Sequence, residues 1–321
     1  MAASAGGRFA GQVALITGSG GGIGREHARL FAQQGAKVVV NDVGFREGAD
    51  AAAVANEIND NGGVAVANTI SATWDHADEL VAAALEAFGR VDILINNATF
   101  TRFDDLWKYP EENWDSTFDV NLKGYFAMIR AVTPHMAERG SGAIVSTSSN
   151  SGMGHASHVP YAAAKEGVVG LTRGAAQELG RFGIRCNAIR PIAAGQSARD
   201  YETRIAKWAE MIKYTFPPRI YAIQQRMLQQ PELWPPSKIS PLVAWLCSEA
   251  ASGVNGCTFE THGDTVSLLS EPEPVRSMHQ DGGWDLDALD TLAPSYLVQD
   301  LTNRYKLDDH PSLQKWQSDD R

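Results

Sequence analysis

The fold is decided by the stretch Val13-Ala-Leu-Ile-Thr-Gly-Ser-Gly-Gly-Gly-Ile-Gly24, which predicts a strand, a glycine-rich turn and the start of a helix. Helical sequence continues to about Gln34, and Gly35 ends it. Glycines let a backbone approach a pyrophosphate closely, and a helix N-terminus presents free N–H groups and positive potential. We therefore expect a dinucleotide site here. Its predicted residues are Gly18, Gly22, Ile23 and Gly24.

Apolar strands and helices continue to alternate along the chain. Continuous apolar strands separated by helices indicate a parallel sheet that is covered on both faces. The expected strands are 13–16, 37–40, 64–67, 91–95, 143–146 and 184–189, and the later expected helices are 49–60, 77–88, 112–139 and 161–181. We therefore predict an α/β fold with one Rossmann-like, doubly wound parallel sheet, in a single domain over residues 1–270.

Two stretches do not follow this alternation. Residues 191–240 come where substrate loops emerge in such folds, and they carry helical sequence at 201–214 and 220–229. We predict that they form a lid or a pocket wall. Residues 271–321 lack a strand–helix repeat, and we expect this C-terminal extension to pack on the core or on a neighbouring subunit. Its expected apolar anchors are Trp284, Tyr296, Leu297, Leu301, Tyr305 and Trp316.

The composition is that of an ordinary globular protein. A chain of 321 residues buries a substantial core. The formal net charge of −10 argues against general nucleic-acid binding, because phosphate contacts need a basic surface. No apolar run approaches the roughly 20 residues that cross a bilayer, and the N-terminus lacks a secretory pattern. We expect a cytoplasmic protein without a membrane span. Its cysteines, Cys186, Cys247 and Cys257, lack metal-ligand spacing, so we expect no metal site.

Polar residues follow the second and fourth expected strands. Asp42 stands where a carboxylate accepts hydrogen bonds from the hydroxyls of an adenosine ribose and repels a 2′-phosphate. No basic residue lies between Gly18 and Gly22, so NAD is favoured over NADP, although the nearby Arg46 keeps NADP open as an alternative. Asn97 and Ala98 come at the same edge of the sheet and are expected to fix the backbone around the cofactor.

A second motif is Tyr161-Ala-Ala-Ala-Lys165, which follows the pair Ser148-Ser149. Residues four apart lie on one face of a helix, so a phenol and an ammonium are placed side by side. A free phenol titrates near pH ~10, and a neighbouring positive charge favours its ionised form. The pair is therefore expected to donate and accept protons near neutral pH, opposite the dinucleotide, in a hydride-transfer site.

In this order, the motifs resemble those of the short-chain dehydrogenase/reductase family over roughly residues 9–263. The resemblance rests on the glycine-rich turn, Asn96-Asn97-Ala98, the stretch Val-Asn121-Leu-Lys-Gly, the serine pair and the Tyr161–Lys165 spacing. It implies that Tyr161 is the general acid/base and that Lys165 favours its phenolate and holds the nicotinamide ribose. It also implies that Asn121 holds a water in a proton relay, and that a serine hydrogen-bonds the substrate oxygen.

The family spacing places the serine in two ways. Counted from Gly152 it is Ser149, and counted back from Tyr161 it is Ser148. We prefer Ser149 and explain the conflict by a deletion of one residue. Pro191 and Ile192, after the sixth strand, are expected to contact the cofactor.

The sequence departs from the family pattern at several positions. Thr99 stands where glycine is usual, Ile70 and Ser71 where an acidic residue is expected near the adenine, and His262 where the family often has glycine. Ser197 is the available substitute for a threonine that contacts the carboxamide. We expect His262 to be structural or to lie at a subunit interface.

The stretch Val38-Val-Val-Asn-Asp-Val-Gly44 resembles the branch that contains the dehydrogenase domain of peroxisomal multifunctional enzymes and bacterial steroid side-chain enzymes. It suggests a 3-hydroxyacyl thioester or a hydroxysteroid as substrate. Aromatic and sulfur-containing side chains expected nearby suit a bulky apolar molecule, with ordinary core packing as the alternative for each. They are Trp107, Met153, Trp208, Met211, Tyr214 and Phe216, and the polar residues expected there are Asn150, His155 and His158.

The expected function is that of an NAD-dependent oxidoreductase that interconverts a secondary alcohol and a ketone, with Tyr161 as general acid/base. The alternatives are a carbonyl or 3-oxoacyl reductase that runs the same chemistry in reverse, and a catalytically silent NAD-binding scaffold. The resemblance also implies a homodimer or homotetramer that packs through the helices expected at 112–139 and 161–181.

Overall fold

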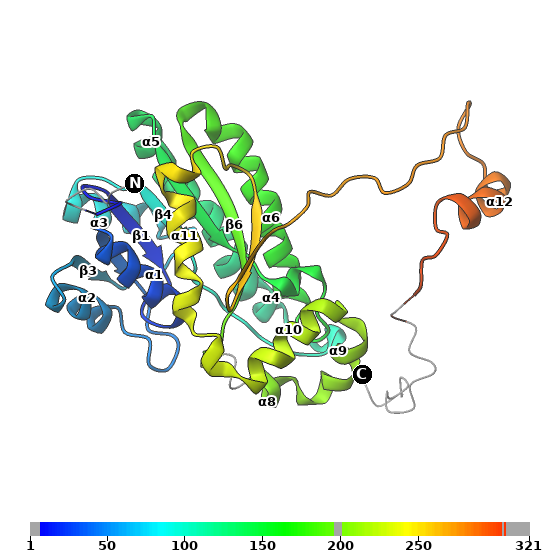
Figure 1. Cartoon of the computed structure of the whole chain (residues 1–321), viewed down its shortest axis with the longest axis horizontal. Helices are drawn as coiled ribbons and strands as arrows, with labels where there is room; N and C mark the ends of the chain where they lie inside the picture. The colour runs from blue at the N-terminus through cyan, green and yellow to red at the C-terminus, as the bar shows by residue number, and fades with distance from the viewer. Residues whose placement is uncertain (1–6, 196–200, 304, 306–321) are drawn as a thin grey trace. The chain divides into compact units, whose positions relative to one another are not determined.

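The computed structural model describes residues 7–195, 201–303 and 305. The chain divides into two compact units, one made of the described residues up to Leu269 and one that begins at Ser270. Figure 1 shows the first unit as a central sheet with helices around it. The predicted α/β fold is confirmed in this unit.

The described residues of the first unit contain one sheet of eight strands in the order β3-β2-β1-β4-β5-β6-β7-β8. Strands β1 to β7 are parallel, and β8 is antiparallel to β7. The order reverses between β1 and β4, and ligands of open α/β sheets bind beyond the carboxyl ends of such strands. The strands are β1 Val13–Thr17, β2 Lys37–Asn41, β3 Val64–Asn68, β4 Ile93–Asn96, β5 Gly142–Thr147, β6 Ile184–Ile192, β7 Thr258–His262 and β8 Thr265–Leu268.

Helices cover both faces of this sheet, which explains the continuous apolar runs of its strands. Alternate strand residues point to opposite faces, so Ala14 and Ile16 pack with α1, α2 and α11, and Val13 and Leu15 pack with α3, α5 and α6. These helices, with α4, are α1 Gly22–Gln33, α2 Ala51–Asp60, α3 Ala77–Phe88, α4 Glu111–Phe118, α5 Gly124–Arg139, α6 Val159–Leu179 and α11 Ser240–Cys247.

The helix expected over 112–139 is interrupted. A π-helical turn, Asp119–Lys123, separates α4 from α5. The wider turn frees the Thr117 carbonyl, and the side-chain amide of Asn121 donates to it at 2.8 Å. The interruption turns Asn121 into the interior, where it is fully buried. π-Turns of this kind occur frequently at functional sites.

Residues 191–240 are the segment predicted to form a lid or a pocket wall, and they are called the lid below as a name only. Their described part contains α8 Tyr201–Ile205, α9 Ala209–Thr215 and α10 Pro218–Gln229. Figure 1 shows these helices gathered at one end of the sheet. They build a separate apolar cluster with the end of β6. Its buried members are Ile192, Ile205, Ile212, Phe216, Ile220, Met227 and Trp234.

The second unit contains α12, Leu286–Tyr296. The Asp285 carboxylate caps this helix by accepting from the Ala288 N–H at 2.7 Å. Within the same unit, Arg276 donates to the Gln299 carbonyl and pairs with Asp300. Trp316, one of the expected anchors, lies outside the described residues. The expected packing of the extension stays a prediction.

Candidate active site

The glycine-rich turn fits tightly against the loop that follows β4. Gly18 has a φ of 63°, and a Cβ there would lie 2.7 Å from the Cα of Ala98. A Cβ on Gly24 would lie 2.2 Å from the Gly18 carbonyl oxygen. Gly22, at the start of α1, has a φ of 53° and no atom near its missing Cβ. The turn therefore needs glycine for its conformation and its packing, and it leaves open space at Gly22.

Hydrogen bonds hold the two loops together. The Asn97 side-chain amide donates to the Thr17 and Gly18 carbonyls at 3.2 and 2.9 Å. The Thr17 hydroxyl accepts from the backbone N–H groups of Asn97 and Ala98 at 3.0 and 3.1 Å. These contacts fix the ends of β1 and β4 on either side of the point where the strand order reverses. Ile23 packs against the apolar cluster below the turn.

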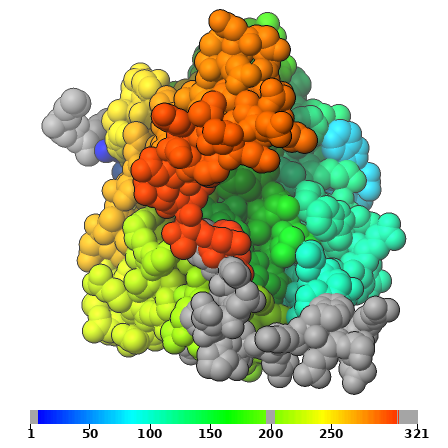
Figure 2. Space-filling view, turned by 90° about the vertical axis from the view of Figure 1, so that its right-hand side faces the viewer, coloured from blue at the N-terminus to red at the C-terminus, as the bar shows by residue number. Residues whose placement is uncertain are grey.

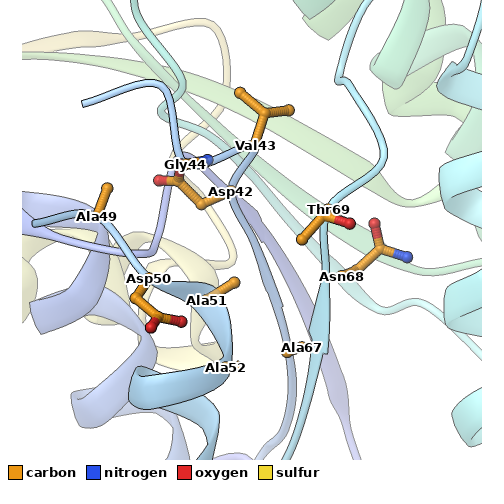
Figure 3. A pocket seen from close by; sticks show the side chains of 10 residues that line it. All are labelled: Asp42, Val43, Gly44, Ala49, Asp50, Ala51, Ala52, Ala67, Asn68 and Thr69. Carbon is orange, nitrogen blue, oxygen red and sulfur yellow. The ribbon is translucent and has the colours of Figure 1, made fainter. Parts of the chain in front are cut away.

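Asp42 follows β2 directly and faces a hollow of about 210 Å³. Its carboxylate accepts from the N–H groups of Gly20 and Gly44 at 3.0 and 2.9 Å. Figure 3 shows Asp42 after β2, and Asn68 and Thr69 at and just after the end of β3, among the residues that line this hollow. The hollow lies next to Asp42, where the sequence predicts the adenosine of a dinucleotide.

Tyr161 and Lys165 lie on α6 and face the same way, as their spacing predicts. The Lys165 ammonium is 5.6 Å from the centre of the Tyr161 ring. Lys165 has no exposed surface, and its ammonium donates to the Thr147 carbonyl at 2.7 Å and to the Tyr125 hydroxyl at 3.1 Å. Tyr125 was not among the residues expected here. Nothing in its sequence neighbourhood distinguishes it from an ordinary core residue.

The two candidate serines point in different directions. The Ser148 hydroxyl donates to the backbone carbonyl of Lys165 at 2.6 Å, so it is used within the scaffold. Ser149 hydrogen-bonds the Tyr161 phenol, as does Thr99. Thr99 also donates to the Asn121 side chain at 2.7 Å. The structure thus brings Ser149, Tyr161 and Lys165 into one group, with Asn121 joined to it through Thr99.

Burial dominates the electrostatics of this group. It raises the pKa of Tyr161, and the hydrogen bonds with Thr99 and Ser149 and the charge of Arg46 oppose that rise only in part. Burial also holds the pKa of Lys165 well below its usual range, and Arg46 lowers it further. Both shifts favour the neutral forms of the two side chains. Hydrogen-bond acceptors around the Lys165 ammonium are therefore important for its protonation state.

Arg46 lies in the loop that follows β2, and its guanidinium donates to the Thr99 carbonyl at 3.2 Å. In the same loop, the Phe45 ring is 5.5 Å from the Phe100 ring, over which the Arg102 guanidinium lies at 4.2 Å. Arg46 is thus neither a purely solvated residue nor part of the wall around Asp42. No sequence signal placed it next to the loop after β4.

Ionic contacts hold the lid. The Asp105 carboxylate accepts from the Trp208 indole N–H at 2.7 Å and pairs with Lys207. Glu260 in β7 is fully buried and binds both ends of the Arg219 guanidinium from α10, at 2.6 and 3.0 Å. Figure 2 shows the lid (yellow-green) on the same face as the chain near residues 100–120 (cyan).

The environment of Glu260 explains its charge. Burial alone raises the pKa of a carboxyl group, but hydrogen bonds from His262 and Arg219 outweigh it and lower the pKa of Glu260 to about 2. The His262 ring is 3.4 Å from the Glu260 carboxylate at its Nε2 and stacks on Trp234. In this structure His262 thus has a structural place.

Of the residues expected near the substrate, His158 lies directly against Tyr161. The His158 ring stacks on Tyr161 at 4.2 Å and on Phe103 at 4.3 Å. Burial holds the pKa of His158 well below its usual range, which favours the neutral imidazole. Met153, Trp208 and Phe216 belong to the apolar cluster of the lid. Trp107, in contrast, has 52% of its surface exposed.

The remaining expected cofactor residues end β6. Pro191 pairs with Thr261 and Ile192 with His262 in the register of β7. Ser197 lies outside the described residues. Over the described ranges, no helix is long and apolar enough to cross a membrane. The same ranges hold no group of three His, Cys, Asp or Glu side chains that could bind a metal ion.

Comparison with known proteins gives consistent matches. The model of the family described as short chain dehydrogenase matches residues 12–204. Peroxisomal multifunctional enzyme type 2 of Drosophila melanogaster is 40% identical over 269 residues, which are 82% of this chain and 40% of that protein. The chain thus spans less than half the length of this relative.

Two further matches cover nearly the whole length of both chains. Hydroxyacyl-CoA dehydrogenase ChsB1 of Mycobacterium tuberculosis is 36% identical over 305 residues, 90% of each chain. The crystal structure of a short chain dehydrogenase from Mycobacterium avium superposes with a TM-score of 0.75 at 33% identity, covering 91% of this chain and 96% of the other.

Proposed function

The chain belongs to the short-chain dehydrogenase/reductase family, and on that premise we propose that it is an NAD-dependent enzyme that interconverts a bulky secondary alcohol and its ketone. The observation that carries the proposal is the group of Ser149, Tyr161 and Lys165. Ser149 follows β5, and Lys165 bonds the last residue of β5, at the edge of the sheet where the loop after β1 forms the glycine-rich turn. A scaffold that only bound a nucleotide would not need this group.

The residues around the turn fit a nicotinamide dinucleotide. Gly18 and Gly24 leave no room for a side chain, whereas Gly22 leaves open space at the start of α1. Gly18, Gly22, Ile23 and Gly24 would hold the pyrophosphate, and Asp42 the adenosine ribose. Asn97, Ala98, Pro191 and Ile192 would hold the nicotinamide half, together with Tyr161 and Lys165. When bound, the nicotinamide accepts a hydride from the alcohol carbon or returns one to the ketone.

The side chains supply the proton transfer. In oxidation, the Tyr161 phenolate takes the proton of the substrate hydroxyl as the C–H bond breaks and the C=O bond forms. The Ser149 hydroxyl donates to the substrate oxygen and so stabilises charge that develops there. The Lys165 ammonium stabilises the phenolate that begins the step. Asn121 is assigned to the proton relay, with its side chain reaching Tyr161 through Thr99.

The preference for NAD rests on Asp42. Its carboxylate lies in the hollow between the ends of β2 and β3, where a 2′-phosphate would meet a negative charge. Arg46, the residue that favours NADP, donates instead to the Thr99 carbonyl and is not part of this wall.

The substrate class follows from the lid and the relatives. The lid buries aromatic, aliphatic and sulfur-containing side chains beside the loops that carry Phe103 and Met153, which suits an apolar substrate. A relative of equal length is named a hydroxyacyl-CoA dehydrogenase. We therefore propose a 3-hydroxyacyl thioester or a hydroxysteroid, with the reverse reduction of a 3-oxoacyl or other carbonyl compound as the alternative direction.

Nucleotide reduction tests this function. Purified protein should reduce NAD with hydroxyacyl-CoA thioesters or hydroxysteroids, and faster than NADP. Tyr161→Phe should abolish turnover and leave NAD binding intact, and Tyr296→Phe in α12 is the control that loses a phenol elsewhere. Tight NAD binding without turnover of any alcohol or ketone favours the scaffold instead. Wild-type activity of Tyr161→Phe contradicts the proposed acid/base.

Assembly and location remain part of the proposal. We propose a homodimer or homotetramer that packs through α4, α5 and α6. Trp114 on α4 and Phe126 on α5 are large exposed apolar side chains that support this packing. Sedimentation analysis tests it. The cytoplasmic location expected from the sequence stays a prediction, since the Drosophila relative is named a peroxisomal enzyme.

A further inference from the structure

Lys165 is a buried ammonium whose described contacts include no carboxylate. Its side chain has no exposed surface, and it forms none of the ion pairs found among the described residues. Two neutral oxygens accept from it, the Thr147 carbonyl at 2.7 Å and the Tyr125 hydroxyl at 3.1 Å. An ammonium has three N–H donors, so one remains for the reaction.

Tyr125 is placed so that its hydroxyl can only accept from Lys165. It belongs to α5, directly after the π-turn, and is 2% exposed. Its own O–H donates to the Ala98 carbonyl at 2.9 Å, which commits the phenol proton. The lone pairs of the oxygen are left for the ammonium, which also lies 4.6 Å from the centre of the Tyr125 ring.

The charged and titratable groups around Lys165 either repel its positive charge or provide no negative charge to balance it. Arg46, from the loop after β2, lowers the pKa of Lys165 further after burial has lowered it. Burial raises the pKa of Tyr161 on α6, so Tyr161 offers Lys165 no negative charge. Burial also lowers the pKa of His158, which stacks on Tyr161, and so favours its neutral form. Tyr125 resists ionisation strongly, because burial and Tyr161 both raise its pKa. It therefore stays a neutral acceptor throughout the working pH range.

Accepting a hydrogen bond favours the charged form of the donor. The Thr147 carbonyl and the Tyr125 hydroxyl therefore oppose the loss of charge that burial favours on Lys165, whose ammonium lies near two phenol rings. Tyr125 also joins Lys165 to Ala98, in the loop that packs against Gly18. This contact links the ammonium to the loop proposed to hold the cofactor.

We propose that Tyr125 is a positioning residue of the active site, whose hydroxyl, anchored on the Ala98 carbonyl, fixes the Lys165 ammonium beside Tyr161 and keeps it charged. The inference deepens the proposed function and rests on it for its kinetic consequences. It assigns to a tyrosine of α5 a task in proton transfer that is distinct from the acid/base role of Tyr161.

The test is Tyr125→Phe, which keeps the ring and removes the hydroxyl. Loss of the acceptor should lower the pKa of Lys165 and so raise that of Tyr161, by about one pH unit. Tyrosinate absorbance, titrated in the protein without nucleotide, measures this shift directly. The same titration with Tyr161→Phe, alone and combined with Tyr125→Phe, isolates the signal of Tyr161.

Kinetics give the second measurement. The acid limb of kcat for alcohol oxidation should move to higher pH by about one unit, which at the foot of the limb is a roughly tenfold fall in kcat. The KM for NAD should change by less than about threefold. Thr133→Val, which removes another hydroxyl from α5 that bonds only the Ile129 carbonyl, should leave the profile unchanged.

The outcomes are separable. An unshifted tyrosinate titration in Tyr125→Phe overturns the inference, as does a fall in kcat that is equal at every pH. If Tyr125→Phe does not fold, Tyr125→Met, with a flexible apolar side chain, takes its place in both titrations. If the wild-type protein oxidises no alcohol, the proposed function fails while the tyrosinate titration still decides the role of Tyr125.

Discussion

The cofactor side and the lid side of the site are held by different forces. On the cofactor side, the loops after β1 and β4 are joined by backbone groups and neutral side chains, such as the Asn97 amide on the Gly18 carbonyl. On the lid side, the main polar contacts are ionic, Arg219 with Glu260 and Lys207 with Asp105. The first set is insensitive to pH and salt, whereas the second depends on ionised groups.

This difference suggests that the two sides of the site have different functions. A site that must hold the same dinucleotide in every turnover benefits from close packing that admits one conformation. If residues 191–240 act as the proposed lid, a few contacts that can be broken and remade would let a substrate enter and leave. The predictions below separate the two sides by asking which function each change disturbs.

The largest effect is expected from Gly24→Ala. The new Cβ would lie 2.2 Å from the Gly18 carbonyl oxygen and 2.6 Å from the Asn97 amide nitrogen, so the turn must move. We expect a loss of about 3 kcal/mol in the free energy of unfolding, together with loss of NAD binding. Urea unfolding and calorimetric NAD titration measure both.

Gly174→Ala is the matched control for that change. Gly174 lies on α6 with no atom near its missing Cβ, so alanine should stabilise the helix by about 1 kcal/mol. Unchanged NAD affinity in Gly24→Ala would mean that the turn tolerates displacement, and the contrast with the lid would disappear.

Next in size is the ion pair that anchors α10. Arg219→Met leaves the fully buried Glu260 carboxylate with only the His262 contact, at a cost of about 1–3 kcal/mol. We expect the KM of the substrate to rise about tenfold while NAD affinity stays unchanged. Limited proteolysis should cut the lid faster. Lys213→Met, on α9, removes a charge at an exposed ion pair and should have little effect.

The same anchor makes the lid sensitive to acid. The pKa of Glu260 is lowered from 4.5 to about 2 in the folded protein, so its charge stabilises the fold above pH 4.5 and that contribution is lost as the pH falls toward 2. Glu260→Gln should remove this acid-dependent fall in stability. An identical pH dependence of urea unfolding in both proteins would contradict the prediction.

The parts of the fold that the sequence predicts are those that depend on local patterns. The strands, most helices, the glycine-rich turn and the family follow from local patterns, in which the apolar period and the turn residues are adjacent in sequence. The strands β7 and β8 and the helix α11 were not among the expected elements. They come after the lid, where the alternation of strand and helix no longer guides the assignment.

Contacts between distant residues were beyond such patterns. Tyr125 meets Lys165 across 40 positions, and Arg46 meets Thr99 across 53. The Asn121 amide, in the π-turn, donates to the Phe100 carbonyl across 21 positions. Each needs the tertiary fold before it exists. The roles assigned to Asn121, Ser149, Tyr161 and Lys165 stay predictions, although the structure places these residues in one connected group.

A smaller effect is expected from Asp42→Ala on the cofactor side. Removal of the carboxylate takes away the proposed ribose contact and the repulsion of a 2′-phosphate. The ratio of kcat/KM with NAD to that with NADP should fall by about tenfold, or about 1.4 kcal/mol. Asp50→Ala is the control, since Asp50 lines the same hollow but caps α2. Equal ratios in wild type and Asp42→Ala would remove the basis for preferring NAD.

The smallest effect is expected at the other contact of the lid, with Asp105→Asn. The amide oxygen can still accept from the Trp208 indole, so only the attraction to Lys207 and Lys108 is lost, and 60% and 40% of these two side chains are exposed. Exposed ion pairs contribute less than about 1 kcal/mol and are screened by salt. The KM of the substrate should therefore rise by no more than about threefold at low ionic strength, and the difference from wild type should vanish at high salt. A salt-independent rise of tenfold or more would show that Asp105, rather than the Glu260–Arg219 pair, is the principal anchor of the lid.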